Sequence, residues 1–244
     1  MASVQLQGMV LSATNVGEFD KRLVILTREE GRITAFAKGA RRPNNALVAA
    51  CSPFNFGVFE LYPGRNSYHL IKADIKNYFS GIPTDFDKVC LGSYFLEMAD
   101  YLSVEGVDER ARLGLLYQTL KALDSGKFSG NLLRDIYELK SYVIAGEYPN
   151  VFSCQCCHTK EKLVNFSMRL QGALCDKCSK TEGGAEISQS CLYAMQFIIA
   201  TPVEKLFTFK LDEATEDELT RLLRSYRLNY HNHKYKSEEF LDLP

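Results

Sequence analysis

Two Cys-x-x-Cys pairs constrain the fold of this chain more than any other sequence feature. Cys154 and Cys157 form the first pair, and Cys175 and Cys178 form the second after seventeen intervening residues. Each pair makes a tight knuckle that points two thiolates at one position, and two facing knuckles complete a tetrahedral zinc site. Because four protein thiolates leave no position for a reactive water, we predict a structural zinc ion.

Two neighbouring residues leave alternatives to this ligand set. Cys156 lies between the first two ligands and His158 follows the second, so either could enter the metal shell. A thiol oxidoreductase is the rival interpretation, and it predicts one reactive pair at a strand–helix junction. Cys51, Cys90 and Cys191 lie in apolar surroundings, and we expect them to be small buried hydrophobic residues.

Composition places the chain among soluble globular proteins. Of its 244 residues, 46% are hydrophobic and 24% are charged. It has no run of about 18 apolar residues that would cross a membrane, and its first residues lack the profile of a secretory signal. We therefore expect a cytoplasmic protein without a membrane partner, in which clustered cysteines bind metal.

The first 80 residues follow the two-residue period of β-strands. Leu23 and Ile25 share one face of a segment, and Ile33, Ala35 and Ala37 continue the pattern after a turn that contains Gly31. Five short strands are predicted, near residues 4–10, 23–27, 33–37, 54–61 and 68–75. A closed five-stranded barrel of the oligonucleotide-binding (OB) type is the simplest arrangement, because closure removes exposed strand edges.

Helical periodicity follows from about residue 84. The last predicted helix covers residues 216–230 and begins with a capping box of Thr215 and Glu218, and His231 and His233 beyond it are typical of a helix end or solvated tail. The cysteine segment lies between helices. We predict an α+β protein with an OB barrel over 1–80, a zinc-ribbon-like segment over 151–184, and one helical domain formed by 81–150 and 185–244.

Basic residues are concentrated in the predicted barrel. Residues 1–80 hold ten Lys or Arg against six Asp or Glu, although the whole chain has a net charge of −1. Lys38, Arg41 and Arg42 form a basic loop directly after a predicted strand, where they suit contacts with phosphates. Tyr62 and Tyr68 could stack on bases, or they could belong to the barrel core.

Catalytic motifs are missing from the sequence. It contains no glycine-rich phosphate loop, no G-x-S-x-G elbow and no H-E-x-x-H motif. We therefore expect a binding protein without catalytic residues. A module with an OB barrel and a zinc ribbon that binds RNA or another protein stays open as the alternative.

The order of these motifs resembles that of the bacterial recombination mediator family RecO. The likeness covers nearly the whole chain and is carried by the paired Cys-x-x-Cys motifs and by Gly8–Leu11, Asp20–Leu23, Leu26–Gly31, Lys38–Pro43 and Tyr235–Leu241. The chain departs from the family pattern at Cys156 and at His158, where a glycine is expected.

The resemblance implies a function in recombinational repair. RecO-like proteins bind single- and double-stranded DNA, anneal complementary strands and, with RecR, help load RecA onto DNA coated by single-strand-binding protein. They also bind the acidic tail of single-strand-binding protein through their helical part, and they work in the bacterial cytoplasm at the nucleoid. Carried over to this chain, the resemblance implies DNA contacts by Lys38, Arg41, Arg42, Lys21, Arg22 and Arg65.

Overall fold

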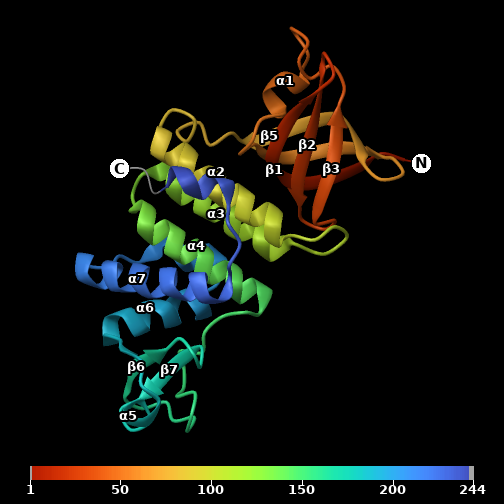
Figure 1. The fold of residues 1–244 in the computed structure, drawn as a ribbon. Coiled ribbons are helices and arrows are strands. Elements are labelled where there is room, and N and C mark those ends of the chain that lie inside the picture. Colours follow the sequence, from red (N-terminus) through yellow and green to blue (C-terminus); the bar gives the residue numbers. More distant parts are fainter. Residues whose placement is uncertain (1, 242–244) are drawn as a thin grey trace. The chain divides into compact units, whose positions relative to one another are not determined.

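A computed structural model describes residues 2–241, and its contacts divide the chain into two compact units (Figure 1). The first, which we call the barrel unit, comprises the described residues 2–127 and 235–241. The second, the knuckle unit, comprises residues 128–234. This division differs from the predicted domains, because the predicted helical domain is shared between both units. Only long-range contacts decide this partition, and the sequence pattern does not encode them.

A closed five-stranded barrel forms the larger part of the barrel unit, in the strand order β1-β2-β3-β5-β4. The α+β class with an OB-type barrel is therefore confirmed. β1 is longer than predicted and bends at a bulge between Val10 and Ser12, so that its two halves pair with β4 and β2. The strands are β1 (Val4–Val16), β2 (Asp20–Thr27), β3 (Arg32–Ala37), β4 (Phe56–Pro63) and β5 (Tyr68–Asn77).

Alternating apolar residues fill the barrel interior. The two faces predicted from sequence, Leu23 with Ile25 and Ile33 with Ala35 and Ala37, point inward and are almost fully buried. The parallel pairing of β3 with β5 closes the barrel, and the short helix α1 (Leu47–Ala50) follows β3. The core also contains Leu6, Val10, Phe59, Leu61 and Leu70.

Helices α2 (Phe86–Leu102) and α3 (Arg110–Ser125) belong to the same unit as the barrel. The β2–β3 turn reaches their connecting loop at Gly31, which has a φ of +61°. A Cβ atom at Gly31 would lie 1.9 Å from the carbonyl oxygen of Val104, so any side chain here would collide with that backbone. Glycine is therefore required both by its φ and by the closeness of the loop.

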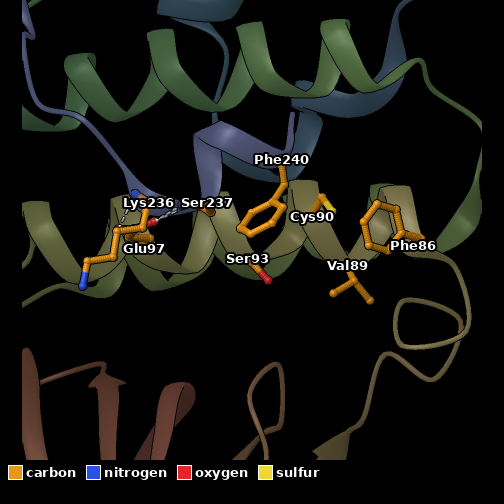
Figure 2. A pocket seen from close by; sticks show the side chains of 8 residues that line it. All are labelled: Phe86, Val89, Cys90, Ser93, Glu97, Lys236, Ser237 and Phe240. Atoms are coloured by element: carbon orange, nitrogen blue, oxygen red, sulfur yellow. Dashed lines mark hydrogen bonds between the residues drawn. The ribbon is translucent and has the colours of Figure 1, made fainter. Parts of the chain in front are cut away.

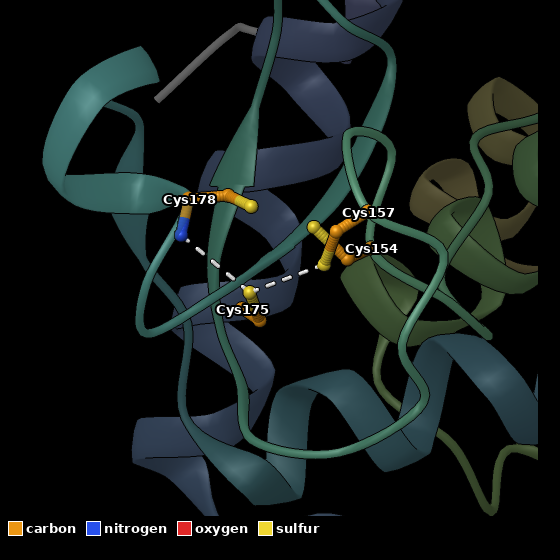
Figure 3. Close-up of side chains that lie close together, drawn as sticks. All are labelled: Cys154, Cys157, Cys175 and Cys178. Atoms are coloured by element: carbon orange, nitrogen blue, oxygen red, sulfur yellow. Dashed lines mark hydrogen bonds between the residues drawn. The ribbon is translucent and has the colours of Figure 1, made fainter.

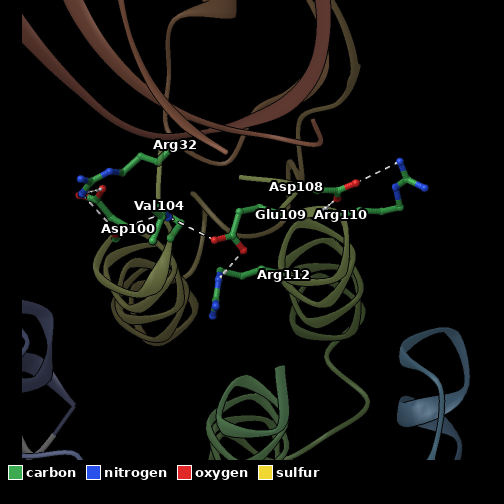
Figure 4. Close-up of polar contacts among 8 residues, drawn as sticks. Arg32, Asp100, Val104, Asp108, Glu109, Arg110 and Arg112 are labelled. Atoms are coloured by element: carbon green, nitrogen blue, oxygen red, sulfur yellow. Dashed lines mark hydrogen bonds and ion pairs between the residues drawn. The ribbon is translucent and has the colours of Figure 1, made fainter. Parts of the chain in front are cut away.

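A buried carboxylate holds the α2–α3 loop in place (Figure 4). Glu109 accepts a hydrogen bond from the Val104 amide at 3.2 Å and another from Arg112 Nε at 2.9 Å. Its own amide donates to the carbonyl of Arg28 in the β2–β3 turn, and Arg32 pairs with Asp100 at 3.1 Å. Glu109 and Arg112 are both buried, so removal of one would leave the other charge without its partner.

The C-terminal segment returns to α2 (Figure 2). The carboxylate of Glu97 accepts hydrogen bonds from the amides of Lys236 and Ser237, each at 2.9 Å, and from the Ser237 hydroxyl at 2.6 Å. These contacts position the 3-10 helix η2 (Lys236–Phe240) along α2. Between the two helices lies a largely apolar pocket lined by Phe86, Val89, Cys90, Ser93, Glu97, Lys236, Ser237 and Phe240.

Three longer helices form the core of the knuckle unit: α4 (Gly130–Ala145), α6 (Gln189–Ala200) and α7 (Glu213–Tyr230), with the 3-10 helix η1 (Val203–Thr208) between the last two. Lys140 on α4 is buried, and its Nζ donates to the carbonyls of Ile198, Ile199 and Thr201 at 2.8–3.1 Å. The lysine therefore satisfies carbonyl groups at the C-terminal end of α6 and places its charge at the favourable end of that helix.

The predicted start of the last helix is wrong. Asp212, not Thr215, is its N-cap, and the Asp212 carboxylate accepts a hydrogen bond from the Thr215 amide at 2.9 Å. Glu218 instead accepts hydrogen bonds from the amide and hydroxyl of Ser188, the N-cap of α6. Thr215 therefore takes part in the cap of α7, whereas Glu218 takes part in the cap of α6.

His231 is the C-cap residue of α7, so of the two alternatives expected from sequence the helix end is correct for it, and its side chain is largely covered. Its ring stacks on Tyr142, with ring centroids 3.6 Å apart and an angle of 4° between the planes. Burial lowers the pKa of His231, against the opposing effect of Glu147. A neutral ring packed on tyrosine is therefore favoured at neutral pH.

Candidate metal centre and nucleic-acid interface

A small sheet brings the two Cys-x-x-Cys pairs together. Its strands are β6 (Leu163–Ser167), β7 (Gly172–Cys175) and β8 (Ala185–Glu186), with the short helix α5 (Ser179–Glu182) between the last two. The segment before the first pair runs beside β7, because Asn150 exchanges hydrogen bonds with Gln171 and Ala173, and the Gln155 amide donates to Ala173. As Cys175 ends β7, this pairing holds the first knuckle next to the second.

The thiols of Cys154, Cys157, Cys175 and Cys178 converge (Figure 3). All four sulfur atoms lie within 4.8 Å of one another, and the Cys157 and Cys175 sulfurs are 3.7 Å apart. Cys154 and Cys175 form a buried inner half of the cluster, whereas Cys157 is exposed and Cys178 is half-buried. In a tetrahedral site with metal–sulfur bonds of about 2.3 Å the sulfurs lie close to 4 Å apart, so the spacing fits such an ion.

Backbone amides favour the charged form of the two inner cysteines. Burial opposes ionisation of Cys154, but amides including those of Cys156 and Cys157 donate to its sulfur, and together these bonds lower its pKa to about 6. The Cys178 and Lys177 amides act in the same way on Cys175 and lower its pKa. In each knuckle, backbone amides therefore donate to the sulfur of the first cysteine and stabilise its thiolate. The thiolate is the form of cysteine that binds metal.

The alternatives raised by the sequence can be compared with this geometry. Within residues 2–241, the converging set contains the four predicted cysteines and neither Cys156 nor His158. His158 is exposed and has a φ of +62°, a conformation that suits glycine and explains why a glycine is expected there. Cys175 and Cys178 do span the junction from β7 to α5, as a redox pair would, but their thiols belong to the converging set.

The remaining cysteines are buried, as expected. Cys51 lies in the barrel core, Cys90 on α2 and Cys191 on α6. Burial raises the pKa of Cys51 to about 11 and that of Cys191 to about 12. The thiols of Cys51 and Cys191 are therefore protonated at neutral pH, and all three side chains pack as small apolar groups.

The basic loop after β3 is braced against the β1–β2 turn. The Arg41 amide donates to the carbonyl of Phe19 at 2.9 Å, and its guanidinium donates to the carbonyl of Glu18 at 3.0 Å. The Arg42 guanidinium lies over the Phe19 ring, 4.8 Å from its centroid. Lys38, Arg41 and Arg42 are all exposed, and the turn holds Arg41 and Arg42 in place; we call the surface patch of these three cations the basic loop.

The other predicted DNA contacts are arranged differently. Arg22 is exposed on β2 near the basic loop, since its neighbour Lys21 pairs with Ala37 at the end of β3. The Lys21 ammonium donates to the carbonyl of Cys51 at 3.1 Å, so part of its capacity is used within the barrel. Arg65 lies on the β4–β5 turn beside the start of β1, whereas the basic loop contacts the turn after the end of β1. The structure therefore does not bring Arg65 into the loop's patch.

The two tyrosines considered for base stacking differ in burial. Tyr62 is 42% exposed on β4, and its side chain remains accessible to a ligand. Tyr68 packs against the barrel core and is only partly exposed. Of the two, Tyr62 retains the accessible ring that stacking requires.

Family models match both parts of the chain. The model described as Recombination protein O N terminal matches residues 1–79, and the one described as Recombination protein O C terminal matches residues 83–239. The chain belongs to the RecO family. Relatives called "DNA repair protein RecO" from Clostridium perfringens and Desulforamulus reducens are each 30% identical to it, over 99% of this chain and 98% and 95% of their own lengths.

The RecO relatives are named as DNA repair proteins, and the resemblance stated from the motifs is thereby confirmed. No helix in the described part of the chain is long and apolar enough to span a membrane.

Proposed function

We propose that this RecO protein is a non-enzymatic DNA-binding mediator of recombinational repair. It anneals complementary strands and, with RecR, helps load RecA onto single strands coated by single-strand-binding protein. The observation that carries the DNA-binding part is the basic loop, in which three exposed cations are held on an OB-type barrel. Family membership supports the assignment to DNA repair.

The basic loop suits contact with phosphates and not readout of bases. Its cations replace counterions condensed on the nucleic acid, and their release favours binding without regard to sequence. Because two complementary strands repel each other, neutralising phosphates on either one lowers the barrier to their approach and pairing. Exposed Tyr62 lies elsewhere on the barrel and could hold an unpaired base by stacking.

Neutralising the basic loop should weaken binding of single-stranded DNA and flatten its dependence on salt. Lys38→Gln with Arg42→Gln removes two exposed charges and leaves intact Arg41, whose guanidinium also braces the β1–β2 turn. Each phosphate contact contributes about 0.7 to the slope of log affinity against log salt for single strands, so we expect the slope to fall by about 1.4. Fluorescence anisotropy with a labelled single-stranded oligonucleotide at several salt concentrations measures this slope.

A matched control removes two charges elsewhere. Arg221→Gln with Arg224→Gln changes two exposed cations on α7 in the knuckle unit and should leave the slope unchanged. An unchanged slope in the basic-loop variant, or an equal loss in the control, would contradict the assignment of this loop. Competition with a single-stranded RNA of matched sequence decides between DNA and RNA, and preferential binding of RNA would favour the RNA-binding alternative.

The four converging cysteines are proposed to hold one structural zinc ion. Four thiolates favour zinc over harder cations such as magnesium or calcium, and the two knuckles lie in a segment of short strands and turns. A bound ion fixes such a segment by joining two loops that are distant in sequence.

The partners proposed for this chain are DNA, RecR and the acidic tail of single-strand-binding protein, with RecA reached indirectly. We propose that it acts in the cytoplasm at the nucleoid. Retention of the chain on immobilised RecR, and on a peptide with the acidic tail sequence, would test the two protein contacts separately.

A further inference from the structure

One row of side chains crosses four strands on the outer face of the barrel. Arg22 on β2 pairs with Phe36 on β3, which pairs in turn with His69 on β5. His69 also pairs with Tyr62 on β4. Residues that lie directly opposite each other on paired strands point to the same face of the sheet. The strand register therefore brings three aromatic rings and one guanidinium into a single line, which we call the aromatic row.

The aromatic row faces away from the barrel core. The residue beside each of its members along the same strand lies in the core: Leu23, Ala35, Leu70 and Leu61. Because successive side chains alternate between the two faces of a strand, the row itself lies on the outer surface. Tyr62 is 42% exposed, His69 is exposed and Phe36 is partly exposed. All three rings can therefore be reached by a ligand.

Positive charge lies at both ends of the aromatic row. Arg22 ends the row on β2, close to the basic loop that follows β3. At the other end, exposed Arg65 lies on the β4–β5 turn, three residues after Tyr62. The His69 ring lies beside this turn, since a Cβ atom at Gly64 would be 4.0 Å from His69 Nε2. This order of charges and rings suits a polyanion that also has flat apolar groups.

One carboxylate lies on the same outer face, and its charge is offset. Glu60 is two residues before Tyr62 on β4 and accepts a hydrogen bond from the Ser3 hydroxyl at 3.0 Å. It lies directly opposite Lys72 on β5. The lysine therefore compensates the negative charge that a phosphate would otherwise meet beside the row.

We propose that the aromatic row is a stacking platform for unpaired bases of a single DNA strand. The inference rests on the proposed DNA-binding function and assigns the bases to the row and the phosphates to the basic loop. Three neighbouring strands about 4.8 Å apart carry the rings, so the row can hold about two or three bases in succession. Stacking uses the flat face of a base and leaves its pairing edge free. A strand held in this way can still pair with its complement.

Removal of the Tyr62 ring tests the platform in the full-length chain. We expect Tyr62→Leu to bind single-stranded DNA about tenfold more weakly than wild type, because a stacking surface is lost. The slope of log affinity against log salt should not change, since no phosphate contact is removed. Affinity for a duplex of the same sequence should also be unchanged, because its bases are already stacked on one another. Fluorescence anisotropy at several salt concentrations measures all three quantities.

Two further variants separate stacking from other effects. Tyr62→Phe retains the ring and should bind single-stranded DNA as wild type does. Tyr78→Leu removes another exposed tyrosine, which lies just beyond the end of β5 that is far from His69, and it should also bind as wild type. In addition, a single strand that contains 5-iododeoxyuridine should crosslink on irradiation to wild type at Phe36, His69 or Tyr62, as identified by mass spectrometry.

The outcomes distinguish failure of the platform from failure of DNA binding. Equal single-strand affinity of Tyr62→Leu and wild type, an equal loss in Tyr62→Phe or Tyr78→Leu, or crosslinks confined to residues outside the row would overturn the platform alone. A flatter salt slope in Tyr62→Leu would also contradict it, since that result indicates lost phosphate contacts. Wild type is measured first, and its failure to bind single-stranded DNA at low salt would overturn both the platform and the proposed function.

Discussion

Asp135 is a buried carboxyl on α4 whose protonation should affect stability near neutral pH. Thr220 on α7 donates a hydrogen bond to Asp135 Oδ2 at 2.6 Å, and only 4% of the residue is exposed. Desolvation raises the pKa of Asp135 from 3.8 to about 7, and the nearby charge of Glu138 acts in the same direction. The folded chain therefore retains a proton here that the unfolded chain has lost.

The sign of the effect follows from linkage. Below about pH 4 the carboxyl is protonated in both states and has no effect on their difference in free energy. Above pH 7 it is charged in both, and the folded state then contains a buried charge. The free energy of unfolding should therefore fall as pH rises from about 4 to 7, at a rate of up to about 1.4 kcal/mol per pH unit.

Asp135→Asn should remove this pH dependence, because the amide oxygen can still accept from Thr220 and carries no charge. At pH 8 we expect the variant to be more stable than wild type by about 1–3 kcal/mol, with the advantage shrinking toward pH 4. Urea unfolding at pH 5, 6, 7 and 8 measures it, with the exposed Asp217→Asn as the control. Parallel stability curves for Asp135→Asn and wild type would contradict the assignment.

At the level of single elements, the sequence predicted structure correctly where the period of apolar residues or the spacing of cysteines determines it. The alternation through Leu23, Ile25 and Ile33 identified strands, and the Cys-x-x-Cys spacing identified the converging thiols. The start of α7 was missed because Asp212 competes successfully with Thr215 for the N-cap position. The position of His231 at the end of α7 was foreseen, but its stacking on Tyr142 was not, because that contact joins residues far apart in sequence.

The carboxylate of Glu97 anchors the first amides of η2 on α2, beside the edge-on packing of Tyr235 against Tyr94 and Tyr101. Glu97→Ala removes the acceptor for both the Lys236 and Ser237 amides, so these amides should exchange with solvent about tenfold or more faster. Glu97→Gln, which retains one acceptor oxygen, should give an intermediate effect. Hydrogen exchange followed by NMR or mass spectrometry measures the change, with the buried amides of β2 as the internal reference. Unchanged exchange at residues 236 and 237 would show that other contacts hold η2.

At the level of the whole molecule, contacts between distant segments determine the two units. The predicted boundaries followed changes in periodicity, which placed all helices in one domain. The structure assigns α2 and α3 to the barrel unit and α4, α6 and α7 to the knuckle unit, and residues 235–241 join the barrel unit. Likewise, Arg65 and the basic loop share a charge and a barrel, but the pairing of β1 with β4 and β2 separates them.

Strand annealing by the full-length RecO protein tests the central claim most directly. Two complementary oligonucleotides, one bearing a fluorophore and the other a quencher, are mixed with protein across a range of salt concentrations, and zinc is quantified on the same sample. We predict annealing faster than in buffer alone, which declines as salt rises, in protein that holds about one zinc ion per chain. Zinc-loaded protein that neither binds DNA nor accelerates annealing at low salt would contradict the account and favour a module that binds RNA or protein.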